Sequence, residues 1–387
     1  MKLIISFFCF VSICMANTET VANTDLENEK IIKIGLIAPL SGEFMEVGES
    51  ILNSVRIALN KVNSEKIEIF PKDNKGDPDQ TLTAAKELQQ LGISVIIGPV
   101  FNENLIYLNE VENVTFLSLT NKIKNLPKNV ISVGINGNSQ FKRIISFLKK
   151  ENLSKTIVLI PKTENENEIK YILSKQKHKF YKIYSYDVSP EKLTKQIQQM
   201  TRYAQRKEDL RRRIKILEKS ELEKDKKRLE KLKKRDTIGK INFDSIIIAD
   251  FDENLKSVTT SFLYSDVNPN QIKFITLNQW FDESLFKENS TNNIYFPSIN
   301  KENYNRFKET YFINFNKNPT EIAVISYDIL GLIYYLAKTN NGKIEKKVFL
   351  KKKKFFGEVG SFEIKNNTIN YELDLYQVVN NNFMVIK

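Results

Sequence analysis

The chain has 387 residues, of which 41% are apolar and 27% charged, so it is long enough to form two lobes of ordinary domain size with separate cores. The net charge is +12, but sixteen Lys and Arg against seven Asp and Glu fall between Arg202 and Arg235. The basic excess therefore belongs to one segment and does not predict a nucleic-acid partner for the rest of the chain. After the N-terminal leader, no apolar run approaches the length of a membrane-spanning helix.

Residues 1–16 have the features of a signal peptide. Lys2 supplies the basic end, Leu3–Ile13 the apolar run, and Cys14-Met15-Ala16 the small-residue cleavage site. Cleavage after Ala16 would remove both cysteines, which would exclude disulfides, thiol catalysis and cysteine metal sites. We therefore expect a soluble protein exported to the periplasm. As an alternative, Val11–Cys14 loosely resembles a lipoprotein processing site, and a membrane tether is expected only if Cys14 is lipidated.

The stretch Ile31–Asn63 predicts the first half of a parallel βαβ unit. Ile34–Ile37 is a short apolar run typical of a strand buried on both faces, and Pro39–Gly42 is a turn. The following helix has one apolar face, made by Val47, Ile51, Val55, Ala58 and Leu59. Ligands of such sheets bind at the carboxyl ends of the strands, so the Ser41–Gly48 loop is the first candidate site.

Strands and helices continue to alternate, which predicts a doubly wound parallel sheet. Asp77 is expected to cap a helix that begins at Pro78 and ends near Gly92, and a short helix is expected at Leu105–Val111. The other strands expected in this first lobe are Ile67–Phe70, Ser94–Ile97, Thr115–Thr120 and Val130–Val133.

The pattern then restarts and predicts a second sheet of the same kind. Its expected strands are Thr156–Ile160, Lys182–Tyr186, Phe243–Ile248 and Lys273–Leu277, and its helices include Phe141–Leu148, Glu168–Leu173 and Asn254–Tyr264. Two amphipathic helices follow at Asn303–Phe315 and Thr320–Lys338. From Phe355 to Ile386 the residues alternate as in antiparallel strands.

The charged segment 190–235 predicts a helical hairpin of coiled-coil type. We expect one helix over about 190–218 and a second over 221–235, with Ser220 and Glu223 as a capping box. Acidic residues precede basic ones by four positions, as in Glu208/Arg212 and Glu230/Lys234, which favours exposed helices. Two interpretations remain open: a solvated hairpin, or an arm that docks on an acidic partner.

The residues give little support to an enzyme, and a pair of catalytic carboxylates is the one alternative that stays open. No phosphate-binding loop, metal-ligand spacing or nucleophile–base pair is present, and we predict no catalytic residue, metal or cofactor. The single histidine, His178, lies in a lysine-rich turn, and Asp73, Asp77 and Asp79 are better explained as turn and capping residues than as a calcium loop.

Four stretches resemble the Leu/Ile/Val-binding-type receptors, the type I periplasmic binding proteins. They are Ile34–Gly42 with Gly48, Asp73–Ala85, Ser94–Pro99, and Tyr327-Asp328 followed by Phe356–Phe362. The resemblance implies two doubly wound lobes that close on a ligand, like a Venus flytrap, around a hinge of three crossovers near Ile135, Phe296 and Ile364. Lobe one would comprise residues 31–136 plus 294–362, and lobe two residues 137–293 plus 363–387, with 190–235 as an insertion.

The resemblance also implies where a ligand would bind. In lobe one it points to Asn102 and its neighbour Glu103, to Thr120 and Asn121, and to Val47, where related receptors place an aromatic residue. In lobe two, Glu166 and Asn167 replace the family's tyrosine–glycine pair, and Asn278 stands in a loop that has lost the acidic residue. Asp250 and Asp252 follow a strand end and could replace the lost charge, while Trp280 could stack on a ligand or pack between the lobes.

Two functions agree with this resemblance. The leading hypothesis is a receptor for a small polar, amino-acid-like ligand, which the receptor delivers to an ABC permease. The alternative comes from a likeness to penicillin-binding protein activators, whose relatives carry a charged helical insertion before a strand like Phe243–Ile248. It implies a non-enzymatic activator of a peptidoglycan synthase that acts by protein contact.

Overall fold

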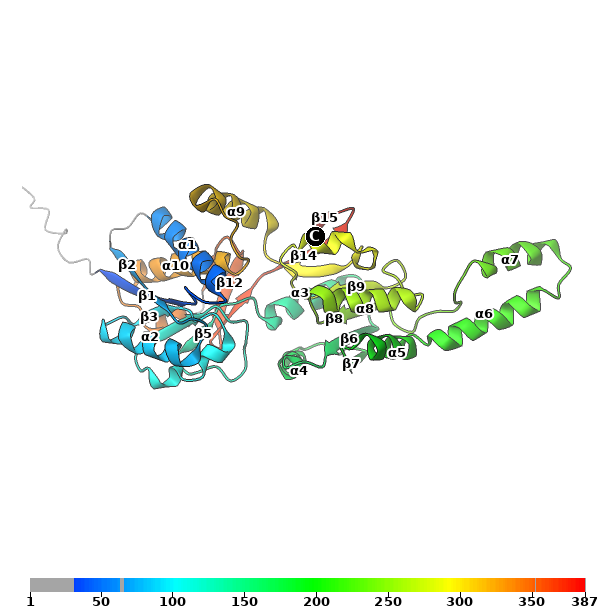
Figure 1. Cartoon of the computed structure of the whole chain (residues 1–387), viewed down its shortest axis with the longest axis horizontal. Coiled ribbons are helices and arrows are strands. Elements are labelled where there is room, and N and C mark those ends of the chain that lie inside the picture. The colour runs from blue at the N-terminus through cyan, green and yellow to red at the C-terminus, as the bar shows by residue number, and fades with distance from the viewer. Residues whose placement is uncertain (1–30, 63–65, 352, 387) are drawn as a thin grey trace, which may run out of the picture.

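Two sheets, each covered by helices on both faces, form two lobes in the computed structural model (Figure 1). The structure describes residues 31–62, 66–351 and 353–386. The predicted signal peptide and Cys14 lie outside these residues. The predicted fold class of two doubly wound α/β lobes is confirmed. Among the described residues, no helix combines the length and the apolar character that a membrane span needs.

Lobe one is built on an eight-stranded sheet with the order β11-β12-β13-β5-β4-β3-β1-β2. The strands β1 to β5 run parallel to their neighbours in the sheet, and β11, β12 and β13 come from the C-terminal region of the chain. The strands are β1 (Ile32–Ala38), β2 (Ile67–Asp73), β3 (Val95–Ile97), β4 (Thr115–Ser118), β5 (Val130–Ser132), β11 (Lys354–Phe356), β12 (Ser361–Lys365) and β13 (Thr368–Tyr371).

Helices cover both faces of this sheet. One core lies under three helices, α1 (Met45–Val62), α9 (Lys301–Phe315) and α10 (Ala323–Thr339). The opposite core lies under α2 (Pro78–Gln90), which Asp77 caps through a bond from the Gln80 N–H at 2.9 Å, as predicted. The expected helix at Leu105–Val111 is instead two 3₁₀ turns, Asn102–Leu105 and Leu108–Glu110. A short helix, α11 (Lys346–Phe349), precedes β11.

Lobe two has a seven-stranded sheet with the order β15-β14-β10-β9-β8-β6-β7. Its strands are β6 (Thr156–Pro161), β7 (Lys182–Tyr186), β8 (Ser245–Ile248), β9 (Lys273–Thr276), β10 (Tyr295–Ser298), β14 (Asp374–Val379) and β15 (Asn382–Ile386). Helices α3 (Gly137–Lys150) and α4 (Glu166–Lys175) cover one face, and α5 (Pro190–Met200) and α8 (Asp252–Tyr264) the other.

Two of the three crossovers lie at different positions from those expected. The first, after β5 near Ile135, agrees with the prediction. The second follows Ser298, because β10 pairs with β9 and β14 in the lobe-two sheet, so a boundary at 293/294 assigns this strand to the wrong lobe. The third lies between Tyr371 and Asp374, because β13 pairs with β5 in lobe one, so the boundary at 362/363 comes too early.

The predicted hairpin is present as an arm that projects from lobe two, away from lobe one (Figure 1). It consists of α6 (Tyr203–Leu217) and α7 (Glu223–Lys233), which contact each other. The expected single helix over 190–218 is broken at Arg202, whose left-handed backbone (φ 55°) separates α5 from α6. Helix α7 begins at Glu223 and not at 221; Ser220 donates its hydroxyl to Asp225 at 2.6 Å, so the predicted capping box does not form.

Candidate functional site

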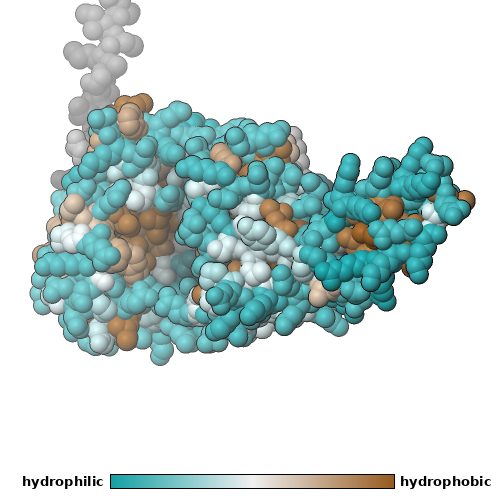
Figure 2. Space-filling model, turned by 45° about the vertical axis from the view of Figure 1, so that its right-hand side comes forward, coloured by the Kyte–Doolittle hydropathy of each residue, from teal (hydrophilic) through white to brown (hydrophobic). Residues whose placement is uncertain are grey.

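The carboxyl ends of strands from both lobes meet at a cavity of about 330 Å³. It lies between the exits of β3, β4 and β5 in lobe one and the exits of β8 and β9 in lobe two, where ligands of doubly wound sheets bind. Figure 2 shows a hollow between the two lobes with apolar surface on its lobe-one side. The lining is mainly apolar, and its polar members are Asn102, Glu103, Thr120, Asn121, Lys122, Gln140 and Asn278.

The polar part of the lobe-one wall is the loop after β4. Thr120 is buried and its carbonyl accepts hydrogen bonds from the Ser132 hydroxyl at 2.7 Å and the Gly134 N–H at 2.9 Å. A Cβ at Gly134 would lie 2.5 Å from this carbonyl oxygen, so the close approach of the β5 exit requires glycine. Asn121 and Lys122 follow at the cavity, so the structure brings together three of the residues predicted for lobe one, Asn102, Thr120 and Asn121.

The amide groups in the lobe-two wall are used to hold the loop after β9. The Asn278 N–H donates to Gln140 Oε1 at 2.8 Å, and Asn278 Oδ1 accepts from the Trp280 N–H at 3.1 Å and the Ser298 hydroxyl at 2.8 Å. Asn278 therefore lines the cavity as predicted, but its side-chain oxygen already has two donors. The remaining surface on this side is aromatic, from Phe251 and Trp280.

Asp250 does not reach the cavity. The Tyr186 hydroxyl donates to Asp250 Oδ2 and the Phe251 N–H donates to Oδ1 at 2.9 Å, so the carboxylate lies behind the strand ends. Burial raises the pKa of Asp250, opposed by the hydrogen bond from Tyr186, and burial and the nearby carboxylate raise the pKa of Tyr186. The expectation that Asp250 faces a ligand is therefore wrong for this arrangement. Tyr186 ends β7, and sequence spacing gave no signal that its hydroxyl would cross to Asp250.

Three other predicted site residues also lie away from this cavity. Glu166 accepts hydrogen bonds from Lys170 at 2.5 Å and the Ser185 hydroxyl at 2.6 Å within lobe two, and it does not line the small cavity. Val47 packs on the lobe-one core. Asp252, the first residue of α8 and in a left-handed conformation (φ 48°), opens on a separate cavity.

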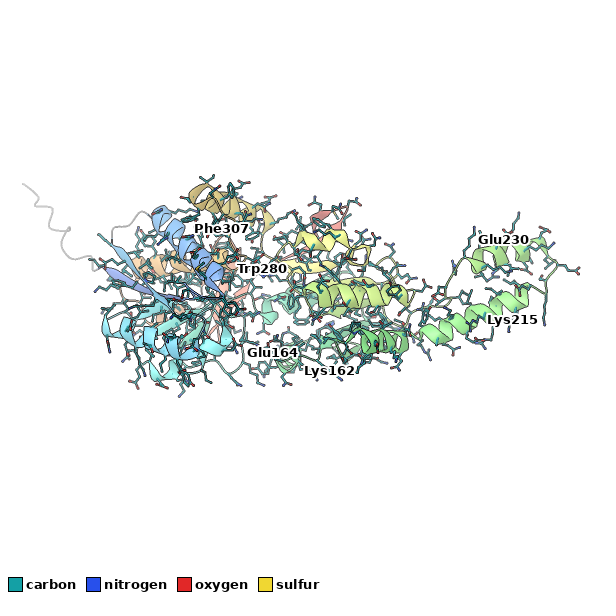
Figure 3. All side chains as sticks on the ribbon, in the orientation of Figure 1. Lys162, Glu164, Lys215, Glu230, Trp280 and Phe307 are labelled. Carbon is teal, nitrogen blue, oxygen red and sulfur yellow. The ribbon has the colours of Figure 1, made fainter. Side chains whose placement is uncertain are left out.

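This second cavity has a volume of about 710 Å³ and lies beyond Trp280. Its lobe-one side is formed by α9 and the loop before α10, and its lobe-two side by the loop after β9 and the turn before β15. Phe251, Asn278 and Trp280 line both cavities, so Trp280 forms part of the partition between them. Figure 3 shows Trp280 at the junction of the two lobes.

The opening loop, Ser41–Gly48, has a structural role. Asp73 accepts hydrogen bonds from the Leu40 N–H at 2.8 Å and the Ser41 hydroxyl at 2.5 Å. Burial acts to raise the pKa of Asp73, but these bonds and one from the Lys75 N–H lower it. A Cβ at Gly48 would lie 2.0 Å from the Pro39 carbonyl, which explains why the motif has glycine there. The motif thus fixes the turn, and it lines neither cavity.

Aromatic residues join the lobes on the side of the second cavity, and the sequence analysis had singled out only Trp280. Phe281 lies 6.1 Å from Tyr304 of α9 and 4.9 Å from Tyr376 of β14, measured between ring centroids. Trp280 lies 6.4 Å from the same Tyr304, and both Trp280 and Phe281 pack against the lobe-one core. The loop after β9 is therefore also a contact between the lobes.

Two hydrogen bonds join the lobes beside the small cavity. Lys122 Nζ donates to Asn165 Oδ1 at 2.7 Å, and the Ile123 N–H donates to Glu168 Oε1 at 2.9 Å. Both donors lie in the loop after β4 and both acceptors lie at the start of α4. The described residues are thus in a closed arrangement, held by polar contacts at one side of the cleft and by aromatic contacts at the other.

The side chains that line the small cavity can orient a bound molecule. Within the described ranges, no group of three or more His, Cys, Asp or Glu side chains is placed to hold a metal ion. The polar groups at the small cavity are mainly neutral donors and acceptors, which can orient a ligand.

Residues 31–167 match a family model described as periplasmic binding protein. The Leu/Ile/Val-binding protein BraC3 of Rhizobium johnstonii is 33% identical over 86 residues, which are 21% of this chain and 23% of that protein. The chain aligns with only 28% of the length of one curated relative and 23% of the length of BraC3, the other.

Two solved structures are similar in fold to nearly the whole chain. LivJ of Streptococcus pneumoniae, a branched-chain amino acid transporter substrate-binding protein in complex with isoleucine, has a TM-score of 0.54 at 17% identity, over 92% of this chain and 100% of that chain. The C-domain of LpoA of Haemophilus influenzae, a regulator of PBP1A, has a TM-score of 0.61 at 12% identity, over 92% of this chain and 100% of that chain. With the family match in its N-terminal part, the chain is therefore a protein of the type I periplasmic binding protein fold.

Proposed function

We propose that the chain is a periplasmic solute receptor whose small cavity binds a carboxylate or neutral polar compound with an apolar or aromatic body, for delivery to an ABC permease. The amino-acid-like ligand suggested by the resemblance fits less well than such a compound. The reason lies in the charge of the two cavity walls.

This proposal rests on one observation: within the part of the chain that the structure describes, the lobe-two wall of the small cavity contains no carboxylate. Among the described residues at the small cavity, lobe two contributes the rings of Phe251 and Trp280 and the amides of Gln140 and Asn278, but no carboxylate. Asp250 is bonded to Tyr186 behind the wall. An ammonium group buried on this side would lose its hydration without gaining a counter-charge, which costs several kcal/mol.

The lobe-one wall can hold the head group. The Thr120 hydroxyl, the Asn121 amide and the Lys122 ammonium lie in consecutive positions at the cavity, and donors of this kind suit a carboxylate. Glu103 is the one acidic residue at the cavity among the described residues, and it is exposed at the rim, where water screens it. A volume of about 330 Å³ falls in the range of small-molecule sites.

Matched pairs of ligands test the proposal. Leucine and 4-methylpentanoate have the same body and carboxylate and differ in the ammonium group; phenylalanine and 3-phenylpropanoate form a second pair. We expect the deaminated member of at least one pair to bind and to raise the melting temperature in a thermal-shift titration, because ligand binding stabilises the native state. The amino acid of that pair should bind at least about tenfold more weakly, the equivalent of about 1.4 kcal/mol.

Variants locate the site in the same assay. Lys122→Met should weaken binding of the deaminated ligand more than Asn165→Ala, which removes only the lobe contact of Lys122. Glu103→Gln, at the exposed rim, should leave binding unchanged. If leucine binds more tightly than 4-methylpentanoate and Glu103→Gln removes that preference, lobe one supplies the ammonium site and the proposed ligand class is wrong. If no compound of either type shifts the melting temperature, the receptor proposal fails for these ligands.

A second candidate is an activator of a peptidoglycan synthase that works by contact. It is favoured by the two sets of contacts that hold the lobes together around a partly filled cleft, and by the likeness in fold to the LpoA C-domain. Addition of the purified chain to a bifunctional penicillin-binding protein of the same organism should then increase glycan polymerisation. No stimulation, together with ligand binding in the thermal-shift assay, would reject this candidate.

A further inference from the structure

The arm is fixed to lobe two by a buried arginine. Arg206 lies in the first turn of α6, and its guanidinium donates to the carbonyls of Thr201 at 3.0 Å and Ser265 at 2.5 Å and to the Thr237 hydroxyl at 2.8 Å. Only 5% of Arg206 is exposed. Because Thr201 and Thr237 flank the arm and Ser265 ends α8, this side chain clamps both ends of the insertion to the lobe.

Beyond this clamp the arm carries an excess of unpaired positive charge. Acidic residues of the arm are largely matched within it: Glu208 with Arg211, Asp209 with Arg212, Glu218 with Lys233, and Glu223 with Lys226. Six further cations of α7 and the two residues that follow it are exposed, whereas Leu229 and Leu232 are partly buried on another side of the helix. We name these the α7 stripe: Lys224, Lys227, Arg228, Lys231, Lys234 and Arg235.

The far end of the arm is apolar as well as basic. Ile216, near the end of α6, is 60% exposed, and Leu222, in the turn before α7, is 55% exposed. Both are flanked by lysines, Lys215, Lys219 and Lys224. Figure 2 shows the arm as a mostly hydrophilic projection with small apolar areas, and Figure 3 places Lys215 and Glu230 on its two helices.

We propose that this arm binds the surface of an anionic lipid bilayer. The α7 stripe supplies a row of cations to lipid phosphates, and Ile216 and Leu222 enter the interface at the tip. Clusters of Lys and Arg with a few apolar residues have the composition that recognises anionic membrane surfaces.

The composition of the arm argues against a protein partner. Lysine is depleted in protein interfaces, and binding energy there is concentrated in Trp, Tyr and Arg. Four of the six residues of the stripe are lysines, and residues 207–235 contain no aromatic side chain. A diffuse row of mobile ammonium groups suits a fluid charged surface better than a fixed set of carboxylates, where each lysine would have to be immobilised.

Co-sedimentation of the full mature chain with vesicles tests the proposal. The vesicles are phosphatidylcholine alone or with about 30% phosphatidylglycerol, at low salt and at about 0.5 M salt. We expect binding to the anionic vesicles only, and its loss at high salt. The arm variant reverses four lysines of the stripe: Lys224→Glu, Lys227→Glu, Lys231→Glu and Lys234→Glu. It should lower the partition coefficient by more than about tenfold.

A control variant carries the same charge change at exposed lysines elsewhere: Lys177→Glu, Lys179→Glu, Lys287→Glu and Lys338→Glu. It should lower binding much less than the arm variant. A second variant, Ile216→Ser with Leu222→Ser, keeps all charges and should weaken the binding that remains at intermediate salt. Circular dichroism of each variant establishes that the lobes remain folded.

Three results would overturn the proposal. The first is that the wild type does not bind anionic vesicles at low salt. The second is that the arm variant and the control variant lose binding equally. The third is that the chain binds soluble polyglutamate through the α7 stripe and does not bind the vesicles. The last result would assign the arm to an acidic protein. None of these measurements depends on ligand binding in the cleft, so the receptor proposal is tested separately.

Discussion

Asp328 is a buried carboxylate with a structural role. Its two oxygens accept hydrogen bonds from the Glu358 and Val359 N–H groups, both at 2.8 Å, so it ties α10 to the turn before β12. A Cβ at Gly357 would lie 2.2 Å from Asp328 Oδ2, and this position therefore requires glycine. The two motifs that supported the resemblance, Tyr327-Asp328 and Phe356–Phe362, are thus one structural contact.

Burial raises the pKa of Asp328 to about 7, although the two N–H groups act in the opposite direction. The folded chain therefore holds a proton between about pH 4 and pH 7 that the unfolded chain releases, since an unfolded aspartate has a pKa of about 3.9. The stabilisation from this group is fully present below about pH 4 and is lost as the pH rises to about 7.

Asp328→Asn tests this linkage. Asparagine does not titrate, so the difference between the free energies of unfolding at about pH 5 and pH 8 should be smaller in the variant than in the wild type. We expect the decrease to be roughly 1.4 kcal/mol or more, which corresponds to a pKa shift of at least about one unit. The variant should also be less stable at both values, because its NH₂ faces one of the two N–H donors. Urea unfolding at the two pH values measures both effects. An unchanged difference would show that Asp328 does not titrate in this range.

At the scale of elements, the loop after β9 combines strain with packing. Trp280 and Phe281 both have left-handed backbones, with φ of 49° and 62°, which costs about 1 kcal/mol or more each for residues other than glycine. Their rings meet Tyr304 across the lobes, and this aromatic packing offsets the strain. The position of Trp280 between the cavities thus depends on contacts far away in the sequence.

Phe281→Ala should loosen the contact between the lobes. It removes ring contacts to Tyr304 of lobe one as well as to Tyr376 of lobe two, and we expect a loss of about 3 kcal/mol in stability, within the usual cost of Phe→Ala in a core. It should also increase the radius of gyration in small-angle X-ray scattering. Phe286→Ala is the control, because the ring contact the structure records for Phe286 is to Phe383 of lobe two. An equal expansion in both variants would contradict the role of Phe281.

In the arm, the local sequence pattern predicts that helices form, but not where each helix ends. The periodicity predicted two helices and a turn, and the described residues form them. The structure differs at the ends and in the pairing: Arg202 breaks the first helix, and Glu208 pairs with Arg211, three positions on, in place of the expected Arg212. Both spacings bring side chains to the same helix face, so sequence alone does not select between them.

For the whole molecule, the closed arrangement depends on few polar contacts. Glu168 of lobe two accepts the Ile123 N–H of lobe one, and Asn165 accepts Lys122 Nζ. Loss of a contact that is made only in a closed state shifts the population toward an open state. These residues were not among those predicted as site residues, since they hold lobe to lobe and carry no pattern of their own.

Glu168→Ala should therefore shift the chain toward an open form. We expect a larger radius of gyration without ligand and a severalfold weaker affinity for the compound identified by the thermal-shift titration, because binding must then also close the lobes. Glu166→Ala is a matched control on the same helix, since Glu166 bonds only to Ser185 and Lys170 within lobe two. If Glu166→Ala weakens binding as much as Glu168→Ala, then Glu166 does contribute to the site and our assignment of it is wrong.

The sequence by itself determined the two-lobed fold, most strands and helices, the charged arm, and the lobe-one part of the cleft at Asn102, Thr120 and Asn121. The strands, the helices and the arm depend on hydrophobic periodicity, capping and turn residues, which are local, while the positions of Asn102, Thr120 and Asn121 follow from the resemblance to the type I periplasmic binding proteins. Only the tertiary structure decided which sheet receives β10 and β13, because a short alternating strand fits either sheet equally well.

Tertiary structure also decided which predicted residues face the cleft. Asp250 was placed correctly at a strand end, but the Tyr186 hydroxyl from β7 turns it into a buried structural pair. Trp280 reaches the cavity because Tyr304 of α9 packs beside it. The packing of whole elements determines which distant residue a side chain contacts. Because of this packing, the lobe-two wall consists of aromatic rings where the sequence analysis expected the carboxylate of Asp250.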